Sequence, residues 1–265
     1  MAKKNFSNSV DRFGNNIDNY NVVEDRHQYG DIRMDEYQYE MFDSIVKTES
    51  SIHFVEAPAG SGKTTIAFAA GCYLYHTGKI GGVIYIVSPY AEQRQGFLPG
   101  DQTKKSEVYF EPAWQALLEC GEDPESVIAD EAMAKQGINK YDNKWVTLCT
   151  CSYLRGSNIK NKLVIIDEAQ NYTEADLRTV VSRIHDDCRV IIAGNVRQCD
   201  LSSVSKSGMM KCLNHYMINY PENSRLHELV YNYRGWISCG ADEDWGEKPV
   251  YFPCTKVATP RRLES

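Results

Sequence analysis

Short apolar runs alternate along this chain with longer stretches in which apolar residues recur every three or four positions. The short runs are rich in Val and Ile, which is typical of strands buried on both faces of a parallel sheet. The longer stretches have the period of helices that pack one face against such a sheet. The expected strands are 52–55, 83–87, 146–150, 162–166 and 189–193. The expected helices are 35–47, 65–74, 106–120, 124–134, 173–184 and 208–216.

Strands and helices that alternate in this way predict an α/β fold, a parallel sheet with helices on both faces. Changes in composition suggest where the domain begins and ends. Residues 1–30 are rich in Asn, Asp and Tyr, and we expect a flexible N-terminal extension there. Residues 31–215 are expected to hold the core domain. Residues 216–265 are expected to form a C-terminal extension packed on the core, loose from about residue 255.

A glycine-rich segment joins the first expected strand to the helix that follows it. A loop in this position points backbone N–H groups and the positive end of a helix at one spot, which suits a phosphate group. Lys63 is then within reach of the β- and γ-phosphates of a nucleoside triphosphate, and the Thr64 hydroxyl can hold Mg²⁺. Ala57 departs from the usual glycine at the first position of this pattern. The residues expected to bind the nucleotide are Pro58, Ala59, Gly60, Ser61, Gly62, Lys63, Thr64 and Thr65.

Two acidic residues follow the expected strand at 162–166. Because open α/β sheets bind ligands at the carboxyl ends of their strands, Asp167 is expected to hold Mg²⁺ opposite Thr64. Glu168 is expected to orient and deprotonate the attacking water, in line with the leaving phosphate. The alternative is an ordinary strand end followed by an acidic helix cap, and the phosphate loop argues against it.

Gln198 lies one strand later, in the segment Gly194–Asp200. There it is placed to hydrogen-bond the γ-phosphate or the attacking water, and so to report hydrolysis to neighbouring loops. The alternative is an exposed loop residue without a role in the site.

Composition and charge limit the range of partners. The chain is 42% hydrophobic and 25% charged, which is ordinary for a globular protein, and no apolar run approaches the length of a membrane span. The first residues lack the apolar core of a signal peptide, so we expect a cytoplasmic protein without membrane contact. A net charge of −7 argues against a surface that is basic throughout, but leaves room for a local basic groove.

The order of several motifs resembles the PhoH-like ATPases over about residues 35–215. The core of that family is similar to the first RecA-like domain of superfamily-1 helicases. The resemblance implies a P-loop NTPase with a RecA-like fold that uses ATP and Mg²⁺, and it suggests a homo-oligomer. The matching segments are A-G-S-G-K-T at 59–64, G-F-L-P-G-D at 96–101, Y-L-R-G at 153–156, I-D-E-A-Q-N at 166–171 and G-x-x-x-Q-x-D at 194–200.

The resemblance also implies a role for Gln38. In that helicase superfamily a Gln upstream of the phosphate loop reads the adenine edge and favours ATP over other nucleotides. The alternative is a helix residue that faces solvent.

Three features depart from the family pattern. The chain has Gly-Asn at 194–195 where the family usually has Gly-Asp, and Ser-Pro at 88–89 where the family commonly has Arg-Pro. The stretch between 89 and 96 is also shorter than usual. None of these changes affects the lysine, threonine and acidic residues of the expected site, so ATP binding is expected to survive.

Phosphoryl transfer also needs a cation on the γ-phosphate, often an arginine on the side opposite the loop. About 60 residues follow Asp200, too few for the second RecA-like domain that supplies this arginine in two-domain helicases. We therefore expect it from a neighbouring subunit of a ring-like homo-oligomer, such as a hexamer, or from the C-terminal region. The candidates are Arg155, Arg197 and Arg234, each of which could equally form a surface ion pair.

The function predicted from these residues is ATP hydrolysis with Mg²⁺, coupled to single-stranded nucleic acid. RNA is favoured by analogy with the helicase core. One alternative is a nucleotide switch or scaffold without catalysis. Another is a small-molecule kinase, against which Glu168 argues because it occupies the water-activating position. The Asn- and Tyr-rich termini and the nine cysteines favour a phage origin.

Overall fold

The computed structural model describes most of the chain between His27 and Asp242, together with Lys256 and Val257. Several expectations lie outside the described residues. They concern most of the N-terminal extension, the segment 96–101, Arg155 and most of the tail from residue 255. The described ranges are 27–49, 51–88, 102–129, 144–154, 156–201, 204–242 and 256–257.

Seven strands within these ranges form one sheet in which every neighbouring pair is parallel. They are β3 (Ser51–Glu56), β4 (Val83–Val87), β5 (Ile128–Ala129), β6 (Val146–Thr150), β7 (Leu163–Ile166), β8 (Arg189–Gly194) and β9 (Ser224–Glu228). Their order across the sheet is β5-β6-β4-β7-β8-β3-β9. Strands that follow one another along the chain are therefore often not neighbours, and β8 lies between β3 and β7.

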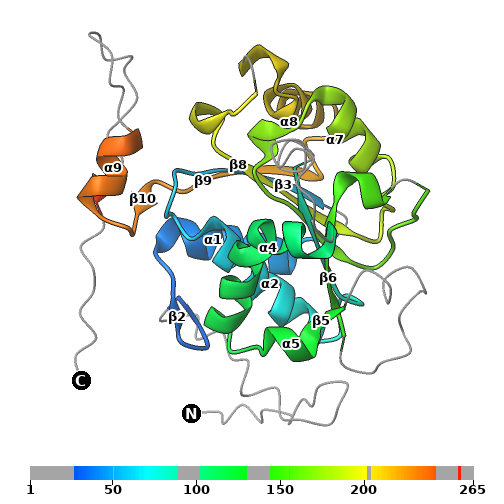
Figure 1. Ribbon diagram of the computed structural model, residues 1–265, viewed down its shortest axis with the longest axis horizontal. Helices are drawn as coiled ribbons and strands as arrows, with labels where there is room; N and C mark the ends of the chain where they lie inside the picture. Colours follow the sequence, from blue (N-terminus) through cyan, green and yellow to red (C-terminus); the bar gives the residue numbers. More distant parts are fainter. Residues whose placement is uncertain are drawn as a thin grey trace, which may run out of the picture.

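Helices cover both faces of this sheet (Figure 1). One face carries α1 (Glu36–Lys47), α2 (Lys63–His76), α4 (Gln102–Glu119) and α5 (Pro124–Val127). The other face carries α7 (Glu174–Val181) and α8 (Met209–Asn219). The predicted α/β architecture, a parallel sheet with helices on both faces, is therefore confirmed.

The sheet has one apolar core on each of its two faces, and successive residues of a central strand pack alternately into the two cores. In β7, Leu163 and Ile165 pack on the side of α1 and α2, whereas Val164 and Ile166 pack on the side of α7 and α8. None of the four is more than 1% exposed. Burial of each such side chain contributes roughly 2 kcal/mol to the free energy of unfolding. Since both faces of the strand are buried, its sequence is continuously apolar rather than alternating.

Several helix predictions were wrong at their ends. Helix α4 begins at Gln102 instead of residue 106, and α8 ends at Asn219 instead of residue 216. The helix expected at 124–134 ends at Val127, and Ile128–Ala129 is strand β5 because it pairs with β6. The helix expected to reach residue 184 ends at Val181, and Ile184 instead forms a parallel bridge with Ile159. The strand β9 was not predicted, because its sequence S-R-L-H-E has too few apolar residues to indicate one.

Smaller elements accompany the main sheet. Helix α9 (Trp236–Asp242) lies at the side of the body in Figure 1. No helix within the described ranges is both long and apolar enough to cross a bilayer. The domain boundaries expected at residues 30 and 215 stay predictions. The short strands are β1 (Gln28–Tyr29), β2 (Ile32–Arg33), β10 (Tyr231–Asn232) and β11 (Lys256–Val257).

A buried histidine pair joins β3 to the edge strand β9. His53 Nδ1 and His227 Nε2 lie 3.1 Å apart, and His53 Nε2 also contacts Thr48 Oγ1 at 3.0 Å and Ser51 Oγ at 2.9 Å. Burial lowers the pKa of His53 to about 3 and the pKa of His227 to about 4, and the charge of Arg225 adds to both shifts. Both rings are therefore neutral in the folded protein near pH 7.

We expect the free energy of unfolding to fall as the pH drops below about 6.5. The unfolded histidines take up protons near their ordinary pKa of 6.5, but the folded pKa values are about 3 and about 4. The stability that this pair contributes is thus complete above pH 6.5 and is lost as the pH falls toward 4. The substitution His227→Gln should lower the slope of unfolding free energy between pH 6.5 and 5 by up to about 1.4 kcal/mol per pH unit.

Chemical denaturation at several pH values measures this slope. His215→Gln, on the exposed side of α8, is the matched control and should leave the slope unchanged. Equal slopes for the wild type and His227→Gln would contradict the prediction.

Candidate functional site

The phosphate loop connects the end of β3 to the first turn of α2. Gly60 and Gly62 have φ angles of 71° and 79°, left-handed conformations that favour glycine. Ser61 is 1% exposed, and its Oγ has no hydrogen-bond partner among the described residues. A buried hydroxyl without a partner, next to the N–H groups that begin a helix, fits a site for phosphate oxygens. The other predicted loop residues, Pro58 and Ala59, are half-buried.

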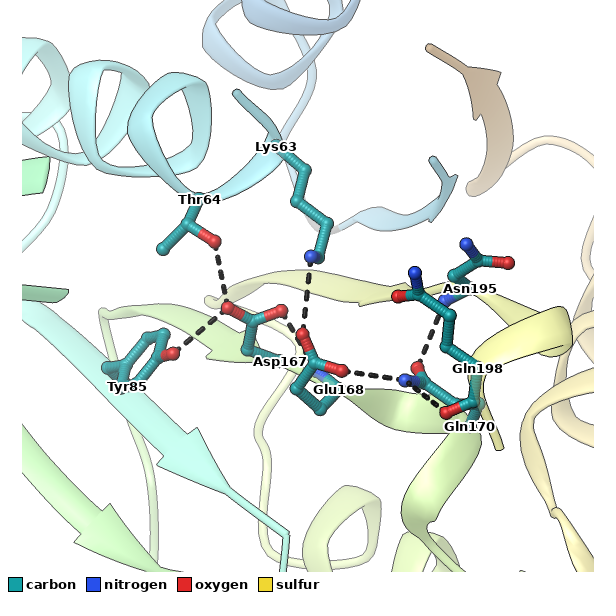
Figure 2. Close-up of polar contacts among 8 residues, drawn as sticks. All are labelled: Lys63, Thr64, Tyr85, Asp167, Glu168, Gln170, Asn195 and Gln198. Carbon is teal, nitrogen blue, oxygen red and sulfur yellow. Dashed lines mark hydrogen bonds and ion pairs between the residues drawn. The ribbon is translucent and has the colours of Figure 1, made fainter. Parts of the chain in front are cut away.

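Thr64 and Asp167 meet at the carboxyl edge of the sheet (Figure 2). Thr64 Oγ1 donates a hydrogen bond to Asp167 Oδ2 at 2.8 Å, and the Tyr85 hydroxyl donates to the same oxygen at 2.9 Å. The N–H of Glu168 donates to Asp167 Oδ1 at 2.9 Å. Asp167 is only 2% exposed, so these donors take the place of water around its carboxylate. Burial and the Asp167 charge raise the pKa of Tyr85 well above its ordinary value, which keeps its hydroxyl a donor.

Lys63 and Glu168 form an ion pair beside that contact. Lys63 Nζ lies 3.3 Å from Glu168 Oε1. Burial by itself lowers the pKa of Lys63, but the carboxylates of Asp167 and Glu168 outweigh burial, and the pKa is raised. Lys63 is therefore a cation at ordinary pH, as a phosphate loop requires. The Glu168 side chain is 48% exposed and that of Lys63 is 14% exposed, so the carboxylate is the partner that can leave the pair.

The loop after β8 places Gln198 at the same edge of the sheet. A short 3-10 turn, η5 (Val196–Gln198), follows Asn195, whose Oδ1 accepts the N–H of Arg197 at 3.0 Å. Figure 2 shows the Gln198 side chain beside Gln170 and Asn195, on the same side of the site as the Lys63–Glu168 ion pair. Asn195 caps this turn with an amide oxygen in the way that an Asp carboxylate would, so its departure from the Gly-Asp pattern keeps the turn.

Two other polar residues near the site make contacts within the fold. The Thr65 hydroxyl donates to Glu119 Oε2 at 2.7 Å, which ties α2 to the end of α4. Ser88 is 3% exposed, and its hydroxyl donates to Asn171 O at 2.8 Å, joining the end of β4 to the turn after Glu168. The role of Thr65 in nucleotide binding stays a prediction.

Gln38 lies against the phosphate loop. Its side chain is buried, Nε2 donates to Ser61 O at 2.8 Å, and Oε1 accepts the Asp35 N–H at 3.1 Å in the capping box of α1. A Cβ added at Gly62 would lie 2.9 Å from Gln38 Nε2. The alternative of a solvent-facing residue is therefore wrong, whereas contact with an adenine edge stays a prediction.

The segment Tyr231–Arg234 packs over the same loop. The Tyr233 N–H donates to Gly60 O at 2.8 Å, and Asn232 Oδ1 accepts the Arg234 N–H at 2.9 Å. A Cβ added at Gly60 would lie 2.7 Å from Arg234 Cγ and 2.8 Å from Asn232 Oδ1. The C-terminal part of the chain thus supplies one wall of the candidate site.

The three arginines predicted as candidate cations lie in different parts of the chain relative to the site. Arg234 lies at the phosphate loop, and its charge acts on Lys63. Arg197 is exposed in the turn η5. Arg155 lies outside the described residues.

Three groups that contribute to this site were not predicted from the sequence to have a role in it. Tyr85 was predicted only as part of an apolar strand, and Gln170 only as part of a motif. The run at 231–234 has no helical or strand period, so only its arginine was identified. A polar tip on a core strand and an amide two residues after the expected catalytic acid are the signals that could have pointed to Tyr85 and Gln170.

The donor chemistry of the site fits Mg²⁺ and a nucleotide. Hydroxyl and carboxylate oxygens, such as those of Thr64 and Asp167, are ligands that Mg²⁺ prefers. Within the part of the chain that the structure describes, no group of three or more His, Cys, Asp and Glu side chains could hold a metal ion. Mg²⁺ commonly binds one or two protein oxygens together with substrate phosphates, and this pair of residues suits that arrangement.

The strand order and the loop together define the class of protein. The strand that leads into the phosphate loop is separated by one strand, β8, from the strand that ends in Asp167 and Glu168. A parallel sheet with this loop and this acidic pair belongs to a P-loop NTPase with a RecA-like core. Within that class the chain belongs to the PhoH-like protein family, whose model matches residues 32–226.

Similar curated proteins carry the same family name. Protein PhoH of Escherichia coli (strain K12) is 30% identical over 187 residues, which cover 65% of this chain and 49% of that protein. A PhoH-like protein of Bacillus subtilis (strain 168) is 33% identical over 155 residues, which cover 57% of this chain and 44% of that protein. The chain thus spans less than half the length of these relatives.

Solved structures match more distantly. The Sulfolobus solfataricus SWI2/SNF2 ATPase core in complex with dsDNA has a TM-score of 0.43 and 14% identity, covering 74% of this chain and 45% of that one. The Pyrococcus furiosus Hef helicase domain has a TM-score of 0.43 and 16% identity, covering 72% and 37%.

We predict that Gly60→Ala displaces the segment 231–234. Alanine in a left-handed conformation costs about 1 kcal/mol wherever it occurs. At Gly60 the added Cβ would also meet Arg234 and Asn232 within 3 Å, whereas Gly78, with a φ of 74°, has nothing within 4 Å. Gly78→Ala is therefore the matched control for strain alone. Hydrogen exchange of the Tyr233 N–H should quicken only in Gly60→Ala, and equal exchange in both variants would contradict this packing.

Proposed function

We propose that this protein binds ATP with Mg²⁺ and hydrolyses it, and that single-stranded nucleic acid, RNA in preference to DNA, stimulates the turnover. One observation carries the proposal. Lys63 and Thr64 at the start of α2 meet Glu168 and Asp167 at the end of β7, at 3.3 Å and 2.8 Å. This combination brings a phosphate-binding cation, a pair of Mg²⁺ ligands and a carboxylate base together. Membership of the PhoH-like family supports the ATPase part.

Each of these residues has a separate task in the proposed reaction. Lys63 and the loop N–H groups bind the phosphates, and Gln38 contacts the adenine edge. Thr64 and Asp167 hold the Mg²⁺, which when bound neutralises charge on the phosphate oxygens. Glu168 orients the attacking water and takes its proton, for which it has to leave Lys63. Gln198 bonds the γ-phosphate or the water.

A nucleotide switch without turnover is the second candidate, and one observation favours it. Glu168 is bound to Lys63 and has a left-handed backbone with a φ of 52°. In this arrangement the carboxylate is engaged with the cation that the phosphates need. If nucleotide binding does not release Glu168, the protein changes conformation with its nucleotide but hydrolyses none of it.

We predict that Glu168→Gln lowers kcat for ATP hydrolysis by about 100-fold or more, because it removes the proton acceptor. ATP should bind at least as tightly, since Lys63 loses its ion-pair partner. Lys63→Ala should instead raise the Kd for ATP roughly 10- to 100-fold, because a charged hydrogen bond is lost. Phosphate release measures kcat, and calorimetry measures Kd.

Glu174→Gln is the matched control for this experiment. Its carboxylate also pairs with cations, Arg178 and Lys211, but it lies on α7 outside the site. Adding single-stranded RNA, single-stranded DNA or neither then tests the coupling. Hydrolysis that no nucleic acid stimulates would refute the coupling, and ATP binding without hydrolysis in the wild type would favour the switch.

We further propose that Arg234, from beside the phosphate loop, provides the additional cation for the γ-phosphate within its own subunit. Its side chain lies beside Gly60, and its charge acts on Lys63. A ring is then not needed to complete the charge, although a homo-oligomer stays a prediction that sedimentation with ATP can test.

We predict that Arg234→Ala lowers kcat by about 1,000-fold, whereas Arg178→Ala, on the exposed side of α7, leaves kcat unchanged. Mixing the inactive variants Arg234→Ala and Lys63→Ala distinguishes the two sources of the cation. An arginine that acts within its own subunit gives no recovery of activity on mixing. Recovery of activity would assign the arginine to a neighbouring subunit.

A further inference from the structure

Gln170 lies between the Glu168 carboxylate and the loop that follows β8. It belongs to the 3-10 turn η4 (Ala169–Asn171) and is 0% exposed. Its Nε2 donates to Glu168 Oε2 at 2.6 Å and to Gln198 O at 3.4 Å, while its Oε1 accepts the Asn195 N–H at 3.0 Å. Figure 2 shows this amide between the carboxylate and the loop. The amide nitrogen therefore bonds both the carboxylate and the loop, and the amide oxygen bonds the loop.

The end of β8 leaves room for this amide. A Cβ added at Gly194 would lie 2.5 Å from Gln170 Oε1 and 2.8 Å from Met209 Sδ. Such distances are too short for a side chain, so glycine is required at 194 for space. The Gln170 amide thus occupies the space that a side chain at position 194 would take.

Further hydrogen bonds join the same two segments. Cys199 Sγ donates to Gln170 O at 3.3 Å, and the Asp200 N–H donates to Asn171 Oδ1 at 2.7 Å. The turn η4 and the loop 195–200 therefore form one hydrogen-bonded unit. The Gln170 side chain links this unit to the Glu168 carboxylate.

The position of the Glu168 carboxylate depends on such direct contacts. Because its side chain is 48% exposed, packing alone does not hold it in place. Lys63 binds Oε1 and Gln170 binds Oε2. When phosphates engage Lys63, the contact from Gln170 is the one that keeps the carboxylate oriented.

We propose that Gln170 is a positioning residue for the reaction. It orients the Glu168 carboxylate after Lys63 has turned to the phosphates, and it ties that carboxylate to the loop 195–200 that carries Gln198. An amide can donate to a carboxylate through its nitrogen and accept a backbone N–H through its oxygen at the same time, whereas a carboxylate or an apolar side chain cannot do both. The inference rests on the proposed function, in which Glu168 is the base for ATP hydrolysis.

Two substitutions separate the two ends of the amide. Gln170→Glu keeps an acceptor for the Asn195 N–H but places a carboxylate against Glu168. Gln170→Met keeps the size of the side chain and removes all three hydrogen bonds of the amide. Each should lower kcat for ATP hydrolysis about 10- to 100-fold, because a misplaced reacting group costs that much. The Kd for ATP should change less than about threefold, since the loop and Lys63 are untouched.

Gln115→Glu is the matched control. Gln115 Nε2 donates to Glu111 Oε1 at 2.8 Å on the exposed side of α4, so the same substitution breaks a like contact outside the site. It should leave kcat unchanged. A merely structural role for Gln170 would lower Tm and weaken ATP binding together with kcat, and that pattern would overturn the inference. Wild-type kcat in both Gln170 variants would also overturn it.

Hydrogen exchange provides a readout that does not need hydrolysis. In the protein without nucleotide, Gln170→Met should speed exchange of the Asn195 N–H about fivefold or more, because its acceptor is lost, whereas Gln170→Glu should not. Unchanged exchange in Gln170→Met would overturn the link to the loop. A wild type that hydrolyses no ATP would refute the proposed function and, with it, the positioning role. Hydrogen exchange of the Asn195 N–H would then be the remaining test of the contact between Gln170 and the loop.

Discussion

The parallel pairing of β8 with both β3 and β7 is the constraint on which the candidate site depends. The backbone of this buried strand has to be hydrogen-bonded on both sides, and the register that results sets Gly194 beside Glu56 and Ile192 beside Ile166. Neighbouring strands lie about 4.8 Å apart, so β3 and β7 are held about 10 Å from each other. The side chains of Lys63 and Thr64 cross that gap to reach the acidic pair at the end of β7.

The charges at this edge are balanced before any nucleotide arrives. Burial would favour a neutral Lys63, but two carboxylates raise its pKa. A triphosphate would replace Glu168 as the partner of that cation and release the carboxylate for work on water. The left-handed backbone of Glu168, with a φ of 52°, costs on the order of 1 kcal/mol, and the turn that follows it maintains this conformation. In the proposed reaction, nucleotide binding and hydrolysis would therefore both involve the Lys63–Glu168 ion pair.

The rest of the site is connected through the ends of the same strands. Asn195, Cys199 and Asp200 follow β8 and bond the turn that follows Glu168. That turn leads into α7, and Met209 at the start of α8 packs against Gly194. The acidic pair is therefore connected, through the turn after Glu168 and the end of β8, to helices α7 and α8 on the second face of the sheet.

The sequence by itself determined the local chemistry and most elements of the sheet. Apolar runs predicted β4 and β6 residue for residue, and the glycine loop and the acidic strand end identified Lys63, Thr64, Asp167 and Glu168, because these patterns follow from backbone geometry and burial. Only the tertiary structure decided what depends on contacts between distant segments. Three features have neighbours that are far away in the chain: the polar strand β9, the segment over Gly60, and the Gln170 amide. The local spacing of apolar residues does not indicate such distant contacts.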